Sequence, residues 1–499
     1  MARYKKYDYK QMVLLPISLE EQIVPGTLEF AIHTVVESKM DLSVFDEKFN
    51  NDETGRLAYD PKVLLKVVLF GYARGLISSR KIERACQENI IFMALSCGQK
   101  PDHSTISTFV SSMRDEILPL FRDVLLVCEE MDLLGGTFFA LDGCKLPSNA
   151  STQHSGSIED LKRKRGKLEE KVRDMLKKQQ EEDSKEEPSD KEYRDKQIEK
   201  FQKEADRIQS WLNENDAKIG KTGREVKSNV TDNDSAKMTS SHGAVQGYNS
   251  QALVDGKHQV IIHGEVFGES QDIVLAEPMI DGARENMEQI GHENYFKDKT
   301  FTADSGYHSK VNIQKCLDQG LDPYIPDKLF RRRDLRFADR MKKGEHCKRT
   351  HYILEDFVYN EKEDHYICPN NKILGLNVKR TVTTGNVYRR YKASEDDCWS
   401  CNKKDKCIYG NGRGPKQLMV PIGPDGENLT KIMIKKLESE EGRKIYSRRM
   451  AIVEPVFANI RFLKRMDRFT LRTKIKVNIQ WLLYCMVHNM EKIANYGFT

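Results

Sequence analysis

Apolar residues recur at helical spacing through the first 135 residues, which predicts an all-helical N-terminal region. One helix is expected over residues 63–73, a second is expected to be capped by Ser78-Ser79, and a third follows residues 101–104, where Asp102 or Ser104 can serve as the N-cap. The second helix carries three cations at outward positions, Arg80, Lys81 and Arg84. Short helices with tight turns and basic outer positions fit a helix-turn-helix DNA-binding module, and they equally fit an ordinary helical bundle with solvated cations.

The pattern changes to short strands after residue 135. A buried strand is expected over residues 137–143, ending at Asp142 and a glycine. Two more strands, over residues 247–254 and 259–267, are separated by a hairpin turn signal. A further strand is expected to end in a turn at Asp304.

Residues 158–213 carry a high density of charge, yet two stretches within them keep apolar residues at helical spacing. This pattern favours a helical hairpin or antiparallel coiled coil that projects from its domain. A largely disordered charged linker is the alternative. Beyond Arg331 the chain is expected to be irregular and cysteine-bearing to about residue 420, and two helical segments, residues 432–463 and 473–494, close it.

The composition narrows the class of protein. Lys and Arg number 81 against 76 Asp and Glu, so the net charge of +5 excludes a uniformly basic coat but leaves local basic patches open. No apolar run approaches the roughly 20 residues of a membrane helix, and the N-terminus lacks the apolar core of a signal peptide. The 11 cysteines therefore indicate thiols or metal ligands rather than disulfides. We expect a soluble, cytoplasmic protein with no membrane partner.

Three acids could carry chemistry. Asp142 and Asp304 each follow a short apolar strand and precede a small residue, a position where a carboxylate can hold a cation or activate water. Glu454 lies beside the apolar face of a closing helix and is our choice for a third metal-holding acid. Taken singly, each aspartate also fits a turn or helix cap, and Glu454 fits a solvated helix position.

These segments, in this order, resemble the insertion-sequence transposases of the DDE class. The resemblance rests on Asp60-Pro-Lys, Pro101-Asp-His-Ser-Thr-Ile, Leu141-Asp-Gly, Ala303-Asp-Ser-Gly-Tyr, Glu454-Pro-Val-Phe and His488-Asn. In related enzymes a Tyr, an Arg, a Glu and a Lys are separated by two, three and six residues. Tyr446 and Arg449 fit the first gap, whereas four residues separate Arg449 from Glu454, and Arg461 stands where the Lys is expected.

The resemblance implies an α/β fold, with an RNase H-like mixed sheet and flanking helices preceded by an all-helical N-terminal domain. The helical DNA-binding domain is expected over residues 1–135. The catalytic domain is expected over residues 136–330 and 430–499. It would carry two insertions, the charged helical hairpin of residues 156–215 and a cysteine-bearing subdomain of residues 331–429.

The resemblance also implies a reaction. Asp142, Asp304 and Glu454 would hold two Mg²⁺ or Mn²⁺ ions, which can activate an attacking oxygen and stabilise a leaving one. Water would first attack at the end of the element, and the freed 3′-hydroxyl would then attack target DNA. Three cations are expected to contact phosphates, Arg449, Arg461 and Lys464, and Tyr446 is a candidate to position DNA or water.

A second metal site is suggested by four cysteines. Cys398 and Cys401 form a CxxC pair, with Cys407 shortly after it and Cys368 29 intervening residues before it. Four such thiolates could make a tetrahedral structural Zn²⁺ site. The alternative is a metal-free loop subdomain with reduced thiols.

The sequence thus predicts a metal-dependent DNA transposase that acts on the terminal inverted repeats of its element and on target DNA. Synapsis of two ends implies at least a homodimer, and the protein would be associated with the nucleoid when bound to DNA. One alternative is a DNA endonuclease without strand transfer. Another is a zinc-bearing, metal-independent DNA-binding regulator whose acids are inert, and a third is a defective transposase copy.

Overall fold

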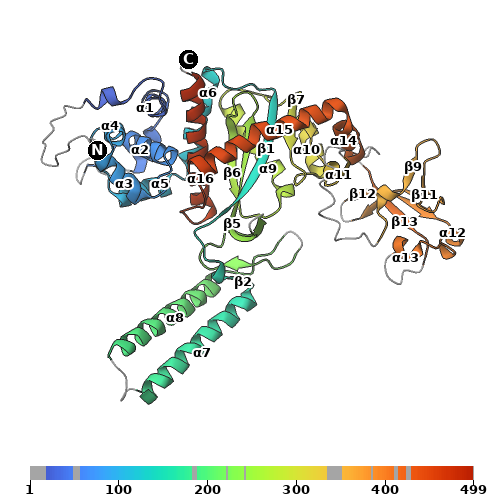
Figure 1. Cartoon of the computed structure of the whole chain (residues 1–499), viewed down its shortest axis with the longest axis horizontal. Helices are drawn as coiled ribbons and strands as arrows, with labels where there is room; N and C mark the ends of the chain where they lie inside the picture. Colours follow the sequence, from blue (N-terminus) through green and yellow to red (C-terminus); the bar gives the residue numbers. More distant parts are fainter. Residues whose placement is uncertain are drawn as a thin grey trace, which may run out of the picture. The chain divides into compact units, whose positions relative to one another are not determined.

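The structure is a computed structural model that describes residues 18–48, 57–182, 188–220, 223–240, 243–333, 351–383, 386–408, 414–422 and 429–497 (Figure 1). The chain divides into two compact units, Met1–Lys299 with Arg449–Thr499, and Thr300–Arg448. Helices and several sheets are both present, which confirms the mixed α/β class. Within the described ranges, no helix is both long enough and apolar enough to cross a membrane.

The N-terminal part of the first unit is helical, as predicted. Its α-helices are α1 (Leu28–Ser38), α2 (Pro61–Ala73), α3 (Ser79–Glu88), α4 (Ile90–Leu95), α5 (His103–Ser112) and α6 (Ile117–Glu130). Asp60 caps α2 by accepting a hydrogen bond from the Lys62 amide at 2.8 Å, and Asp102 caps α5 through the Ser104 amide at 2.9 Å. Ser78 precedes α3 without making a side-chain cap. Short 3₁₀ helices occupy Glu20–Gln22, Ser43–Lys48, Thr152–His154, Asp272–Val274 and Leu354–Asp356.

Two close contacts fix α2 within this region. A Cβ on Gly71 would lie 2.9 Å from Cδ1 of Ile82, so the glycine lets α3 pack tightly against α2. The ring of Tyr72 stacks on that of Tyr484, with 4.7 Å between centroids. Tyr484 belongs to α16 (Lys474–Lys492), and the N-terminal helices are therefore tied to the closing helix of the same unit.

The sheet of the first unit is antiparallel. Its strands are β1 (Phe138–Pro147), β4 (Ala236–Ser240), β5 (Gly243–Asp255) and β6 (Ile261–Phe267). β5 pairs with β1, β4 and β6, and the predicted turn at residues 255–257 joins β5 to β6. β5 is therefore the shared partner around which this part of the sheet is built.

The expectation that the first strand ends at Asp142 is wrong. β1 continues to Pro147 because β5 offers a partner at every position from Phe139 onward. Gly143 lies within the strand, where a Cβ would come 2.0 Å from Nε2 of Gln251. The glycine therefore makes room for a side chain of β5 and does not terminate the strand.

Helix α16 covers this sheet. The indole nitrogen of Trp481 donates a hydrogen bond to the Gln251 carbonyl at 3.0 Å, and the Asn489 amide donates to the Ile261 carbonyl at 2.8 Å. Gly264 allows this approach, because a Cβ there would lie 3.0 Å from the Trp481 ring. A second helix, α9 (Ala276–Gln289), also packs on β6.

The charged segment forms a helical hairpin of α7 (Ile158–Glu182) and α8 (Pro188–Glu214), as predicted. Figure 1 shows the two helices side by side. They run antiparallel, since Arg165 pairs with Gln209 near one end and Gln179 with Asp195 towards the other. Their own small apolar core includes Leu161, Leu168, Ala205, Ile208, Trp211 and Val230.

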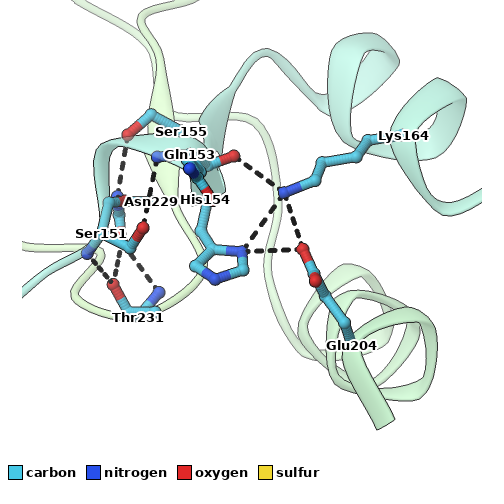
Figure 2. A network of polar contacts seen from close by, with 8 residues as sticks. All are labelled: Ser151, Gln153, His154, Ser155, Lys164, Glu204, Asn229 and Thr231. Carbon is cyan, nitrogen blue, oxygen red and sulfur yellow. Dashed lines mark hydrogen bonds and ion pairs between the residues drawn. The ribbon is translucent and has the colours of Figure 1, made fainter. Parts of the chain in front are cut away.

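The base of the hairpin is held by a polar network (Figure 2). Nζ of Lys164 in α7 donates to the Gln153 carbonyl at 2.9 Å and pairs with Glu204 of α8 at 2.8 Å. His154 lies within 3.5 Å of the same Glu204 carboxylate. A two-stranded pairing of β2 (Ser155–Gly156) with β3 (Ser228–Asn229) adjoins this network. The hairpin is therefore fastened to the loop that follows β1.

The second unit contains a small α/β part and a separate sheet. The first part has β7 (Lys299–Ala303), α10 (Lys310–Asp318), β8 (Leu321–Tyr324) and α11 (Phe330–Arg333). The separate sheet has the order β13-β12-β11-β10-β9. Its elements are β9 (Val358–Asn360), β10 (His365–Ile367), β11 (Ile373–Thr383), β12 (Asn386–Ala393) and β13 (Gln417–Pro421), with α12 (Glu395–Trp399) and α13 (Lys404–Cys407).

The expectation of an irregular chain up to about residue 420 is therefore wrong. The three-residue strands β9 and β10 are too short to show an alternating pattern in the sequence. The five strands enclose a core that includes Phe357, Tyr366, Leu374, Tyr391 and Leu418. Residues 334–350, 384–385, 409–413 and 423–428 of the predicted cysteine-bearing subdomain lie outside the described residues.

The closing helices also differ from the expectation. Residues 432–463 were expected to form one helix, but they divide into α14 (Leu429–Glu438) and α15 (Glu440–Ala458), followed by a π-helix at Asn459–Leu463. Ser439 separates α14 from α15, and its hydroxyl accepts a hydrogen bond from the Gly442 amide at 3.0 Å. A second π-helix, Ile493–Gly497, continues α16.

Candidate active site

Asp142 lies in the middle of β1 and is paired with a cation. One carboxylate oxygen accepts the amide of Gly143 at 2.9 Å, and the other lies 3.0 Å from Nη1 of Arg449. The side chains of Asp142 and Arg449 are 22% and 9% exposed, so the ion pair is largely shielded from water. The sequence placed Arg449 on a DNA phosphate, whereas in this structure it neutralises a candidate catalytic carboxylate.

Glu454 lies on another side of the same helix. It follows Arg449 by five residues of α15, which corresponds to a rotation of about 140° around the helix axis. Its side chain is exposed, whereas Val453 and Val456 are buried with Arg449. The structure therefore brings Asp142 to the buried face of α15 and leaves Glu454 on the solvent face.

A proline next to Glu454 explains how α15 is anchored. Pro455 has no amide hydrogen, so it cannot bond the carbonyl of Ala451 four residues before it. The side-chain amide of Gln259 donates to that carbonyl instead, at 2.9 Å. Gln259 has a positive φ of 62° at the β5–β6 turn, and its carbonyl lies 2.9 Å from Nε2 of His488. Sequence reasoning missed Gln259, for which only the proline within a helix gave a signal.

Arg461 lies close enough to β1 to act on it electrostatically. Burial raises the pKa of the Cys144 thiol to about 12, and the positive charge of Arg461 opposes that rise. Cys144 is two residues from Asp142 and therefore on the same side of the strand. Nε of Arg461 is buried without a hydrogen-bond partner among the described residues.

Lys464 is buried and paired inside the protein. Its Nζ donates to Glu491 at 2.5 Å and to the side-chain oxygen of Asn459 at 2.6 Å. Burial lowers the pKa of the Lys464 ammonium, and the charge of Glu491 counteracts this effect. The predicted phosphate contact by Lys464 does not fit this structure, since its ammonium has no exposed surface.

Asp304 and Tyr446 belong to the second unit. Asp304 directly follows β7, and its carboxylate accepts the Gly306 amide at 2.7 Å, which is the predicted strand-to-turn junction. The ring of Tyr446 packs edge-on against Phe330, with 5.4 Å between centroids. Tyr446 is therefore half-buried against an aromatic partner.

The four predicted cysteine ligands line one small cavity of about 20 Å³ in the second unit. None of these four cysteines, Cys368, Cys398, Cys401 and Cys407, forms a disulfide. The backbone amides of Asn370 and Lys372 both donate to the Cys368 sulfur at 3.3 Å. The backbone amide of Lys416 donates to the Cys398 sulfur at 3.5 Å. Burial raises the pKa of Cys407, and the neighbouring cysteines raise it further. Backbone donors thus already point at two of the sulfurs.

No ready-made metal centre exists in the part of the chain that the structure describes. None of its His, Cys, Asp and Glu side chains form a group of three that could hold an ion as they stand. The four thiols share a cavity, but binding a metal would have to draw the sulfurs closer together.

Two family models match the chain. Residues 17–112 match a transposase domain (DUF772), and residues 367–494 match a transposase DDE domain. The chain is an insertion-sequence DDE transposase. A search of curated proteins found no match. Membership of the family implies a DNA substrate and the use of divalent metal ions.

The two matches cover different parts of the transposase. The DDE match contains Arg449, Glu454, Arg461, Lys464 and the four cysteines, whereas Asp142 and Asp304 precede it. The ion pair between Asp142 and Arg449 therefore joins a matched helix to a strand outside the match.

The N-terminal match contains the three predicted DNA-binding cations of the transposase. Arg80, Lys81 and Arg84 are all exposed on α3, while Ile82 and Cys86 are buried on its other face. Arg84 makes only an exposed pair with Glu88, at 3.6 Å. These side chains contribute little to the fold and are free to meet a ligand.

Proposed function

We propose that this transposase binds the terminal inverted repeats of its element, cleaves the phosphodiester bonds there and joins the 3′-hydroxyl ends to target DNA. The observation that carries the proposal is the shielded ion pair of Asp142 with Arg449, because Arg449 lies on a helix matched to a DDE domain. As the resemblance implies, the catalytic region would have an RNase H-like fold.

Asp142, Asp304 and Glu454 are the proposed metal-holding carboxylates. Their oxygens are the hard ligands that Mg²⁺ or Mn²⁺ takes, so the donor chemistry fits. When bound, the ions would lower the pKa of the attacking water or 3′-hydroxyl and offset charge on the leaving oxygen. Glu454 is exposed on the face of α15 that points away from Asp142, so the shared site would have to form when metal ions and DNA bind.

Arg449 acts as a positioning residue in this proposal. Its guanidinium holds one oxygen of Asp142, and the Gly143 amide holds the other, so the carboxylate is oriented before substrate arrives. Arg461 is only partly buried and lies near the Asp142 side of β1, and it is the proposed phosphate contact. Lys464 is left out of this proposed role because its ammonium is buried and bonded to Glu491.

End recognition is proposed for the N-terminal helices. Exposed Arg80, Lys81 and Arg84 on α3 would bind DNA phosphates, since all three are open to solvent and the pair of Arg84 with Glu88 is itself exposed. Synapsis of two ends would require at least a homodimer.

The cysteine cavity is the proposed site of a structural Zn²⁺ ion. Four thiols facing one small cavity, two of them already accepting backbone amides, match the donor set of a tetrahedral zinc site. Purified protein should contain about one zinc per chain, and Cys398→Ser should remove it. A zinc-free protein that melts at the same temperature with and without chelator would contradict this proposal.

The test of the main proposal is a cleavage and joining assay. Duplexes from the two flanks of the gene would be incubated with Mg²⁺ or Mn²⁺ and with wild type, Asp142→Asn, Asp304→Asn or Glu454→Gln. Glu441→Gln is the matched control, because it removes an exposed carboxylate from the same helix. We expect metal-dependent nicking and joined product that are lost in the three site variants and kept in the control.

Other results would favour a different function. Cutting without joined product would indicate an endonuclease. Tight binding of the ends with no metal-dependent cutting would indicate a zinc-bearing regulator or a defective copy. Cutting that survives Glu454→Gln would show that another acid is the third ligand.

A further inference from the structure

Two large apolar side chains are exposed on the segment that follows the Glu454 helix. Phe462 is 75% and Leu463 is 74% exposed, and among the described large hydrophobic residues only Leu57 is more exposed. Both lie at the end of the π-helix, a rare conformation that is frequent at functional sites. Exposed neighbours of this size indicate a surface that another molecule covers.

Buried contacts of the neighbouring residues hold the segment that carries Phe462 and Leu463 in place. Lys464 is buried and bonded to Asn459 and Glu491, and Asn459 in turn bonds Glu491 at 2.6 Å. Arg465 has a positive φ of 54°, and its side chain lies against Gly75, where a Cβ would come 3.1 Å from Cδ. Two apolar side chains are thus presented on a fixed turn.

The charge around the two side chains selects the partner. The guanidinium carbon of Arg461 lies 5.9 Å from the centre of the Phe462 ring, and exposed Arg465 follows Leu463 by two residues in the chain. Arg468 and Arg472 follow in the same segment, while Asp467 is the one acid between residues 459 and 476. An apolar tip framed by arginines fits a nucleic acid, whose bases are apolar on their faces and whose backbone is anionic.

The segment also runs beside the strand that carries Asp142. The amide of Phe469 donates to the carbonyl of Pro147 at 2.9 Å, at the end of β1. Arg461 acts electrostatically on Cys144, two residues from Asp142. The two apolar side chains therefore lie in the same part of the first unit as the proposed catalytic strand.

We propose that Phe462 and Leu463 form a wedge that enters the base stack of the element's end next to the scissile phosphate. Arg461 and Arg465 would contact the flanking phosphates. This inference rests on the proposed function, and it adds an unstacking step that exposes the phosphate to the acids. Apolar side chains inserted at a base step are a known way for proteins to open and bend a duplex.

The test uses full-length protein and flank duplexes that carry 2-aminopurine at the step where wild type cuts. Wild type should raise the fluorescence as the base unstacks. The double variant Phe462→Ala/Leu463→Ala should lose that rise and cut roughly tenfold or more slowly. A mismatch at the same step should restore most of its cutting, because the base is then already unstacked. Phe462→Trp should behave as wild type, and Tyr193→Ala, an exposed ring on α8, is the matched control.

The outcomes separate the two proposals. Wild type that neither binds nor cuts the flank DNA would remove the proposed function itself. Wild type that cuts, beside a double variant that unstacks and cuts equally well, would overturn the wedge alone. Equal loss on matched and mismatched DNA, or a change from dimer to monomer with unstacking intact, would also overturn it, because the two side chains would then serve the fold or a second copy of the chain.

Discussion

Basic residues in two regions of the transposase look alike in sequence but differ in the structure. On α3, Arg84 pairs with Glu88 at 3.6 Å, and their side chains are 76% and 68% exposed. After α15, Lys464 pairs with Glu491 at 2.5 Å, and their side chains are 1% and 23% exposed. The first pair lies in water, and the second forms part of the interior.

The difference teaches how to interpret a basic cluster. Lys464 is buried although its neighbours Phe462 and Leu463 are exposed, and it has internal partners in Glu491 and Asn459, because an unpaired buried charge is very costly. A cation on a helix with few apolar positions stays in solvent and is available to phosphate. The partners that the fold places around each cation are therefore as informative as the cation itself.

The largest effect is expected when the buried pair is broken. Lys464→Ala should lower the free energy of unfolding by about 3 kcal/mol, because Glu491 and Asn459 lose their common partner. Thermal melting of the variant checks this, and Lys464→Met with Glu491→Gln should recover most of the loss. A variant that melts like wild type but binds DNA poorly would reverse the comparison and make Lys464 a phosphate contact.

The next effect concerns pH. Burial lowers the pKa of His488 to about 3, with the charges of Lys492 and Lys464 acting in the same direction. The unfolded chain takes up a proton below about pH 6.5, and the folded chain does not, so stability is complete above that pH and is lost as pH falls towards about 3.

Between pH 7.5 and 5 this one histidine should cost about 2 kcal/mol of stability. Burial lowers the pKa of His154 as well, which adds to the slope in the same direction. His488→Gln should flatten the dependence of the urea midpoint on pH. An unchanged slope in His488→Gln would mean that other groups control acid stability.

A smaller effect, confined to binding, is expected on α3. Replacing Arg80, Lys81 and Arg84 with Gln should weaken binding of flank DNA roughly tenfold at low salt and reduce the salt slope by up to about 2.7. Melting should not change. The matched control replaces three exposed lysines of the hairpin helix, Lys162, Lys167 and Lys177. Equal loss in both triple variants would indicate nonspecific attraction and not a DNA-reading surface on α3.

The smallest effect is expected for the exposed pair. Glu88→Gln should change stability by less than about 0.5 kcal/mol, because two solvated side chains gain little from each other. Calorimetry of this variant beside Lys464→Ala measures the comparison directly. A shift as large as that of Lys464→Ala would show that exposure does not separate the two regions.

Local sequence signals predicted the elements whose ends are marked by capping residues, a proline or turn residues. Asp60 with Pro61 fixes the start of α2, Asp102 fixes that of α5, and the turn after Asp255 joins two strands as expected. Each signal acts within a few residues, so the rest of the chain was not needed to interpret it.

Features that depend on distant partners could not be predicted. β1 extends past Asp142 because β5 supplies a partner about a hundred residues later, and Gly143 is explained only by the side chain of Gln251. The site shows the same limit. The sequence pointed to Asp142 and Arg449 separately, but their ion pair depends on how α15 meets β1. The three-acid assignment stays a prediction.

The clamp at the hairpin base makes the hairpin a lever arm. A helix of 25 residues such as α7 is about 37 Å long, and Lys164 ties its first turns to α8 and to the loop leaving β1. Because Lys164 contacts both α8 and the loop after β1, a force that acts on the far end of the hairpin would be transmitted to the end of β1, the strand that carries Asp142. Replacing Lys164 would remove its contacts with Glu204 and Gln153 and would loosen the attachment of the hairpin to this loop.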